Sequence, residues 1–484
     1  MKRTLLACAV ACYSALNLSG CVLGPDFQTP ATPLAEHWAP TASAEGHSQG
    51  VESRVDPRWW DSFGDQQLSA LVREAQARNF DVQLAASRLE QSQALRRQIA
   101  ADTLPAVDAS ADYSRSRNTQ RGLNDPSGRS GKQAFSLWNG GLGISWEADL
   151  WGRVKRSVEA ADASVRMAEE DRHGVQLLVI VQTAQHYIRL RGTQQALRVV
   201  QQNLQIARRS LELTQLQVKE GVATDLEVSE AAAQVSEIEA RMAPLQQQSA
   251  QLINALSLLL AREPRALQQQ LQAAAAVPAF GADVPVGLPS ELAQRRPDIR
   301  RAEARLHAAT ASIGVARADF YPRITLSGNF GFQAMQLSDL GSWGSRNFAF
   351  GPGLSVPLFE GGRLQGALQL QEGRQQEAGI TYQKTVLRAW HEVDDALVAY
   401  QAGQRRRDSL QQAVEHSQRA LGSAQQQYAQ GTVDFLNVLT VQNALLANEA
   451  ALVESTANVS LSLVDLYGAL GGGWEAWSEA AVAL

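Results

Sequence analysis

Two short stretches of this 484-residue chain repeat one another: G-V-A-T-D-L-E-V at residues 221–228 and G-T-V-D-F-L-N-V at residues 431–438. Gly, Leu and Val occupy equivalent positions, and the second stretch lies 210 residues after the first. Further upstream the spacing is 217 residues, between Phe80-Asp81 and Pro297-Asp298. We infer that one long structural unit occurs twice, with a loop about seven residues shorter in the second copy.

Each octapeptide is predicted to be a tight turn between two helices. Gly221 and Gly431 stand where a helix C-terminus favours a glycine with positive φ. Thr224 and Asp434 are good N-caps for the helix that follows, and Glu227 completes a capping box with Thr224. These residues serve the turn itself, and they equally suit a surface on which a partner docks.

Around both turns, apolar residues recur every seven positions, which is typical of helices that supercoil against neighbours. They are Leu197, Leu204, Leu211 and Val218 in the first copy, and Val414, Leu421, Tyr428, Leu439, Leu446 and Val453 in the second. At 1.5 Å per residue, residues 149–220 would form about 108 Å of helix. We expect single helices at residues 65–103 and 290–320. A long helix, a turn and a return helix are expected at 149–262 and again at 359–470. An equatorial linker at 263–289 and a C-terminal tail at 471–484 complete the chain.

Residues 104–148 and 321–358 are predicted to be two β-hairpins that cross a membrane. Each contains two stretches of about ten residues in which apolar and polar side chains alternate, as in strands with one face to lipid and one to water. Aromatic residues stand near the strand ends, where interfacial girdles occur: Trp138, Trp146, Tyr321 and Trp343. The alternative is a pair of amphipathic hairpins on a soluble domain.

The N-terminus carries export signals. Residues 1–20 have a cationic start at Lys2-Arg3, a short apolar core and small residues before Cys21, as in a secretory signal peptide. The Leu18–Cys21 sequence resembles the bacterial lipobox, in which the cysteine is acylated and becomes the mature N-terminus. Residues 21–64 would then be a lipid-anchored segment, and Val22 after the cysteine favours the outer membrane. Cys21 is the only cysteine left after cleavage, which excludes a disulfide framework.

Composition excludes several classes of function. The formal charge of −5 becomes −7 without Lys2 and Arg3, and it argues against a nucleic-acid-binding protein. The seven histidines show no metal-ligand spacing, and no G-x-S-x-G or P-loop string is present. Glu392, Asp394 and Asp395 lie close together on a predicted helix, where a solvated or lumen-facing patch is more typical than a catalytic pair.

Four strands are too few to close a membrane barrel, because the smallest barrels have about eight. Two chains would supply eight strands and three chains would supply twelve. The strand count alone leaves both assemblies open.

Four sequence features together resemble the outer-membrane efflux lipoproteins of the TolC/OprM type. They are the lipobox, the two turn motifs, L-A-Q-R-R-P-D-I-R at residues 292–300, and L-G-G-G-W at residues 470–474. The resemblance implies a mostly α protein with a membrane β-barrel: a homotrimer with a shared 12-stranded barrel on a periplasmic helical barrel. It also implies a non-enzymatic conduit without metal or cofactor, apart from a lipid such as palmitate on Cys21.

In this family the conduit receives small toxic compounds from an inner-membrane pump, here expected to be of the RND type, through a periplasmic adaptor. A type I protein secretion conduit and a coiled-coil lipoprotein scaffold without a pore are the alternatives. The expected adaptor-docking tip comprises Gly221, Thr224, Asp225, Leu226, Gly431, Asp434 and Leu436. The expected periplasmic gate comprises Leu421, Gln425 and Tyr428, with Asp225 and Asp434 as possible acidic substitutes.

Overall fold

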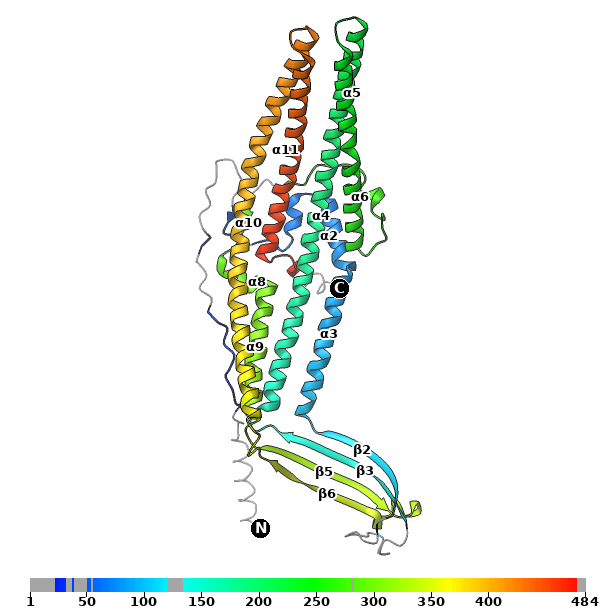
Figure 1. Ribbon diagram of the computed structural model, residues 1–484. Helices are drawn as coiled ribbons and strands as arrows, with labels where there is room; N and C mark the ends of the chain where they lie inside the picture. Colours follow the sequence, from blue (N-terminus) through cyan, green and yellow to red (C-terminus); the bar gives the residue numbers. More distant parts are fainter. Residues whose placement is uncertain are drawn as a thin grey trace. The chain divides into compact units, whose positions relative to one another are not determined.

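The computed structural model describes residues 22–31, 37–38, 50–53, 55–117, 119, 134–279 and 283–476. Its helices are α2 (Gln66–Arg78), α3 (Phe80–Ala100), α4 (Arg153–Lys219), α5 (Asp225–Ala240), α6 (Met242–Leu259), α7 (Gln268–Leu271), α8 (Leu292–Arg295), α9 (Pro297–Ala318), α10 (Arg363–Ala429) and α11 (Phe435–Leu470) (Figure 1). Its strands are β1 (Gly50–Val51), β2 (Ala106–Ser116), β3 (Phe135–Ala148), β4 (Val284–Pro285), β5 (Arg323–Ala334) and β6 (Arg346–Ser355).

The chain divides into two compact units. The sheet unit comprises residues Met1–Pro30, Leu89–Ala168 and Ala302–Tyr382. The turn unit comprises Ala31–Arg88, Glu169–Arg301 and Gln383–Leu484.

The sheet unit contains one four-stranded antiparallel sheet in the order β2-β3-β5-β6. Each copy of the repeat contributes one hairpin. The pairing of β3 with β5 joins the two copies, with Leu142 opposite Phe330 and Trp146 opposite Leu326. The two hairpins expected from the alternating pattern therefore form a single continuous sheet (Figure 1).

The two long helices, α4 and α10, have 67 residues each. At 1.5 Å per residue, each corresponds to about 100 Å of helix. Their sequences are rich in Ala, Gln, Leu, Arg and Glu, which are strong helix formers. Within the described residues, no helix is both long enough and apolar enough to cross a membrane.

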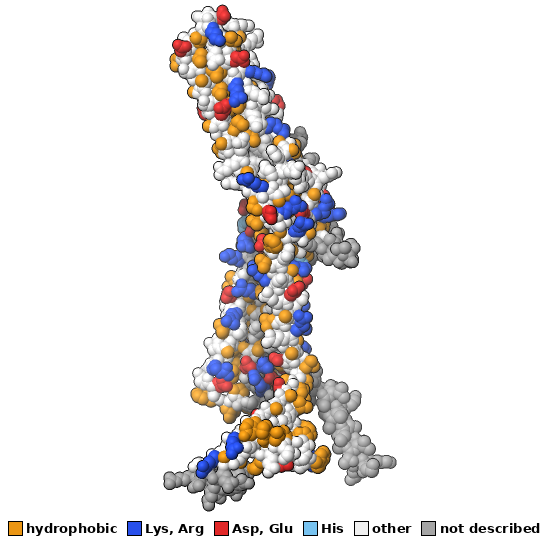
Figure 2. Space-filling model, turned by 90° about the vertical axis from the view of Figure 1, so that its right-hand side faces the viewer, with side chains coloured by type: hydrophobic (Ala, Val, Ile, Leu, Met, Phe, Trp, Pro, Cys, Tyr) orange, Lys and Arg blue, Asp and Glu red, His pale blue; other side chains and the backbone are white. Residues whose placement is uncertain are grey.

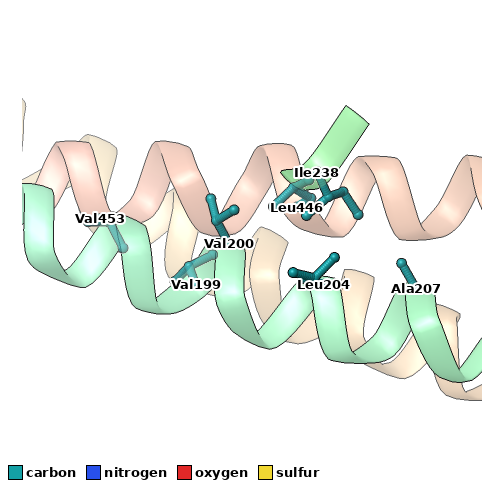
Figure 3. Packing of buried hydrophobic residues seen from close by; sticks show 7 residues of the cluster. All are labelled: Val199, Val200, Leu204, Ala207, Ile238, Leu446 and Val453. Atoms are coloured by element: carbon teal, nitrogen blue, oxygen red, sulfur yellow. The ribbon is translucent and has the colours of Figure 1, made fainter. Parts of the chain in front are cut away.

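Apolar residues at helical spacing build the core of the turn unit. One cluster joins α4, α5 and α11 through Val199, Val200, Leu204, Ala207, Ile238, Leu446 and Val453 (Figure 3). A second cluster lies nearer the turns and contains Ala231, Val414, Leu421, Tyr428, Phe435, Val438 and Leu445. Leu204, Leu421, Tyr428, Leu446 and Val453 all belong to the seven-residue pattern, so this pattern marks packing between helices.

Three helices expected to be continuous are interrupted. Asn79 separates α2 from α3, and its side chain accepts hydrogen bonds from the N–H groups of Asp81 at 2.8 Å and Val82 at 3.2 Å. Pro297 begins α9 after a break from α8, in keeping with the preference of proline for the first helical position. Arg241 separates α5 from α6 in the first copy, whereas the equivalent α11 is unbroken. The first two breaks fall at Phe80-Asp81 and Pro297-Asp298, the pairs that the repeat relates.

Candidate functional site

The sheet has one apolar and one polar face. Cross-strand partners point to the same side of a sheet, and Ala109, Leu142, Phe330 and Phe348 form one such row. Most of these side chains are exposed, and the neighbouring Phe350 is 83% exposed. Figure 2 shows hydrophobic side chains gathered over the strands, at the lower end of that view. An exposed apolar surface of this kind marks a contact with lipid or with another protein.

The opposite face of the sheet carries polar residues that bond across three strands. The Asn139 amide donates to the Asp112 carboxylate at 3.0 Å, and the Gln333 amide donates to the Asn139 side-chain oxygen at 2.7 Å. Ser110 and Asn347 lie on the same side. The sheet therefore separates an apolar surface from a polar one.

The two octapeptide turns have the same backbone structure. Gly221 and Gly431 adopt φ of 73° and 71°. The N–H of Val222 donates to the Gln217 carbonyl at 2.9 Å, and the N–H of Thr432 donates to the Gln427 carbonyl at 3.0 Å. The N–H of each glycine also donates to the carbonyl of the residue three positions before it. These two hydrogen bonds together form the Schellman motif that ends many helices.

The caps of the following helices differ. Thr224 is the N-cap of α5, and its N–H donates to the Glu227 carboxylate at 3.0 Å. Asp434 is the N-cap of α11, but its side chain makes no capping hydrogen bond.

All seven residues expected at the tip are exposed: Gly221, Thr224, Asp225, Leu226, Gly431, Asp434 and Leu436. Leu226 is 68% exposed and Leu436 is 63% exposed, although neighbouring Phe435 and Val438 are buried. Each turn therefore presents one leucine outward at equivalent positions, beside residues that hold the helices together.

The three residues expected at the gate are placed differently. Leu421 and Tyr428 are buried in the second cluster, where the Tyr428 ring lies 5.3 Å from that of Phe435. Burial raises the pKa of Tyr428, and an interaction with the Thr214 side chain opposes that rise. Gln425 is half-buried and lines a cavity of about 280 Å³ with Tyr428 and Leu213. Leu421 and Tyr428 occupy core positions of the seven-residue pattern and pack within the chain, so Gln425 is the least buried of the three. Their role in a gate stays a prediction.

An ion-pair network centred on the buried Arg296 of the turn unit was not expected from the sequence. Arg296 donates to both carboxylate oxygens of Asp298, at 3.0 and 2.8 Å, to Glu392 at 2.7 Å and to the carbonyl of Ala469 at 2.8 Å. It thus links the first turn of α9 to α10 and to the end of α11. Burial opposes the ionisation of Asp298, but the hydrogen bonds and charge of Arg296 outweigh it and lower the pKa of that carboxyl group.

The signal for this network is the R-R-P-D-I-R string at residues 295–300, which contains both Arg296 and Asp298. Glu392 belongs to the acidic cluster noted there, and in the structure it is an ion-pair partner. Among the residues that the structure describes, no group of three or more His, Cys, Asp or Glu could hold a metal ion. Cys21, the expected lipidation site, lies outside the described residues.

Comparisons with known proteins agree with this arrangement. Residues 71–262 and 288–472 match the outer membrane efflux protein family. The outer membrane protein OprJ of Pseudomonas aeruginosa is 34% identical over 463 residues, which cover 95% of each chain. The toluene efflux pump outer membrane protein TtgI of Pseudomonas putida is 34% identical over 466 residues, covering 96% of this chain and 97% of the relative.

The solved structure of the outer-membrane channel OprN superposes with a TM-score of 0.87, at 33% identity, over 94% of this chain and 100% of that chain. These similarities confirm the predicted fold class and the resemblance inferred from the lipobox, the turn motifs and the strings at residues 292–300 and 470–474. The chain belongs to the outer membrane efflux protein family.

Proposed function

We propose that this protein is the outer-membrane channel of a tripartite efflux system and passively conducts small toxic compounds from an inner-membrane pump to the exterior. The observation that carries the proposal is the sheet with one exposed apolar face and one polar face, supplied by two copies of the repeat in a chain of this family. The apolar face suits lipid and the polar face suits a water-filled lumen. TtgI is named for toluene efflux, which supports small molecules as the cargo.

The channel is proposed to be a homotrimer with a shared 12-stranded barrel. Within the described chain, β2 and β6 are the edges of the four-stranded sheet. Strand edges inside a membrane need hydrogen-bond partners, which neighbouring chains can supply. Native mass spectrometry of detergent-extracted protein should give three copies, and planar bilayers should then show conductance. A stable monomer or dimer, or a trimer without conductance, would contradict this assembly.

The two turns are proposed to dock a periplasmic adaptor, which connects the channel to a pump of the RND type. Support comes from their equal backbone structure and from the outward leucines at equivalent positions. Changing Leu226 and Leu436 to Ser should alter the stability of the folded chain by no more than about 0.5 kcal/mol, because both side chains are exposed. Adaptor crosslinking and export of toxic compounds should fall severalfold.

Leu258→Ser is the matched control, since Leu258 is an equally exposed leucine of the turn unit on α6, outside the turn motifs. It should leave crosslinking and export normal. Full export with both turn leucines replaced would exclude the turns as the docking surface.

The lipid anchor is proposed to lie on Cys21. Metabolic labelling with a fatty acid should mark the wild-type chain and not Cys21→Ser. Labelling that survives the substitution would exclude this cysteine as the acylation site.

A further inference from the structure

Residues 22–29, directly after Cys21, lie against α4 and α9 of the sheet unit as a strap without helix or strand. The N–H of Leu23 donates to the carbonyl of Trp151 at 3.1 Å. At the other end of the strap, the Thr29 hydroxyl donates to the Glu303 carboxylate at 2.7 Å. The strap is thus held at both ends.

Arg156 of α4 is the centre of this attachment. Its side chain is only 4% exposed. The guanidinium donates to the carbonyls of Leu23 at 3.1 Å and Gly24 at 3.4 Å, and to the Asp26 carboxylate at 2.7 Å. A fourth bond, at 2.7 Å, goes to Glu159 on the same helix. A buried arginine is stable only when its donors are satisfied, and here the strap satisfies most of them.

The strap also fits α9 closely in shape. Gly24 has a φ of 94°, and a Cβ at this position would lie 2.5 Å from the Cα of Gly314. The Phe27 ring stacks on that of His307, with ring centres 4.4 Å apart and an angle of 10° between the planes. His307 in turn contacts Glu159 at 3.0 Å. Side chains other than glycine at residue 24 would therefore displace the strap.

The N-terminal end of the strap lies beside the ends of two strands. Val22 packs against Gly152, where an added Cβ would lie 2.9 Å from a Val22 methyl group. The adjacent Trp151 ring lies 4.9 Å from that of Tyr321, and these two residues stand within three positions of the end of β3 and the start of β5. Tryptophan and tyrosine are enriched at the boundary between lipid and water.

We propose that residues 22–29 are a dock for the lipid anchor, in which Arg156 is the positioning residue. The dock fixes the point where the acylated N-terminus leaves the folded protein, beside the strand ends, so that acyl chains and strands enter the same leaflet together. If the eight residues of the strap were free, the position of its end would vary by roughly 16 Å. The proposal rests on the proposed acylation of Cys21.

Chymotrypsin cleavage after Phe27 tests whether the strap is docked. In purified wild-type protein the cleavage should be slow, because Phe27 is stacked on His307. Arg156→Met should speed it by at least about tenfold, since it removes the guanidinium whose hydrogen bonds hold Leu23, Gly24 and Asp26 in place and so raises the population of the undocked strap. Gly24→Ala should do the same without altering a helix. Arg305→Met is the control, because it removes only the exposed ion pair between Arg305 of α9 and Glu377. Equal cleavage of wild type and both strap variants would overturn the dock.

A second measurement separates anchoring from simple support of the fold. The rate of assembly into phospholipid vesicles is measured on gels, as the rate at which an assembled form appears that dissociates on heating. Arg156→Met should slow the acylated protein severalfold, to the rate of a chain made without acylation by Cys21→Ala and a different signal peptide. It should not slow that chain further.

Equal slowing of the acylated and unacylated chains would overturn the anchoring role and leave Arg156 as a structural residue. Mass spectrometry of the wild-type N-terminus provides the remaining check. A chain without acyl groups would overturn the dock, while channel conductance would still decide the proposed function independently.

Discussion

Arg296 should stabilise the junction of α9, α10 and α11 far more than the neighbouring Arg388 does. Both arginines contact Asp298 and Glu392, but the side chain of Arg296 is 9% exposed and that of Arg388 is 58% exposed. Removing one partner of a buried ion pair costs about 3–5 kcal/mol. We expect the lower end of this range, about 3 kcal/mol, for Arg296→Met, because Glu392 is itself 43% exposed. Arg388→Met should cost no more than about 1 kcal/mol, as for surface pairs.

Amide hydrogen exchange of peptides around residues 290–300 and 462–472 measures this local stability directly. A loss of 3 kcal/mol should accelerate exchange by about a hundredfold in Arg296→Met. Because the pKa of Asp298 is lowered from its ordinary value of 3.8, its ionised form contributes stability above that value, and this contribution is lost as the pH falls through the folded-state pKa. The difference between wild type and Arg296→Met should therefore narrow below pH 3.8. Equal exchange in the two methionine variants, or a difference that is independent of pH, would refute the reasoning.

Three further results are expected. Phe350→Arg, on the apolar face, should prevent stable membrane assembly, since an arginine facing lipid costs about 2–4 kcal/mol at the bilayer centre. The Ala349→Arg protein, changed on the opposite face, should assemble normally, and single-channel recording should show an altered conductance. Gly431→Val should lower the melting temperature because positive φ costs a side chain about 1–2 kcal/mol, whereas Gly422→Ala, inside α10 with open space around it, should raise it slightly. Phe435→Ala should destabilise the chain by about 3–5 kcal/mol in urea unfolding, because it empties a buried site.

The fold was largely predictable because its signals are periodic. Alternation over residues 104–148 and 321–358 and the seven-residue spacing near the turns each reflect which side of an element is buried. The breaks at Asn79 and Arg241 were missed, because each depends on local capping or backbone geometry rather than on periodicity. Pro297 was a visible signal, since proline favours the first position of a helix.

The site was less predictable. Leu226 and Leu436 are exposed at the start of their helices, and Leu436 is exposed although the adjacent Phe435 is buried, so apolar character alone does not predict which of these residues faces outward. The seven-residue spacing of Leu421 and Tyr428 predicts that they are buried, as they are, whereas their role in a gate follows only from the family resemblance and stays a prediction. Asp298 and Glu159 lie within three residues of the arginines that they contact. The other partners of Arg156 and Arg296 lie up to 173 residues away in sequence, and no local pattern relates these to the arginines.

The two copies of the repeat share a turn but differ in how the turn is held. In the second copy, Phe435 is buried against Tyr428 and Val438 is buried beside it. In the first copy, exposed Asp225 occupies the position equivalent to Phe435, and the capping bond from Thr224 to Glu227 supports the start of the helix. Apolar packing holds one turn and a solvent-exposed hydrogen bond holds the other, so the first turn opens at lower cost. In the proposed trimer, a ring of alternating copies would then combine rigid and deformable turns at the end that is proposed to dock the adaptor.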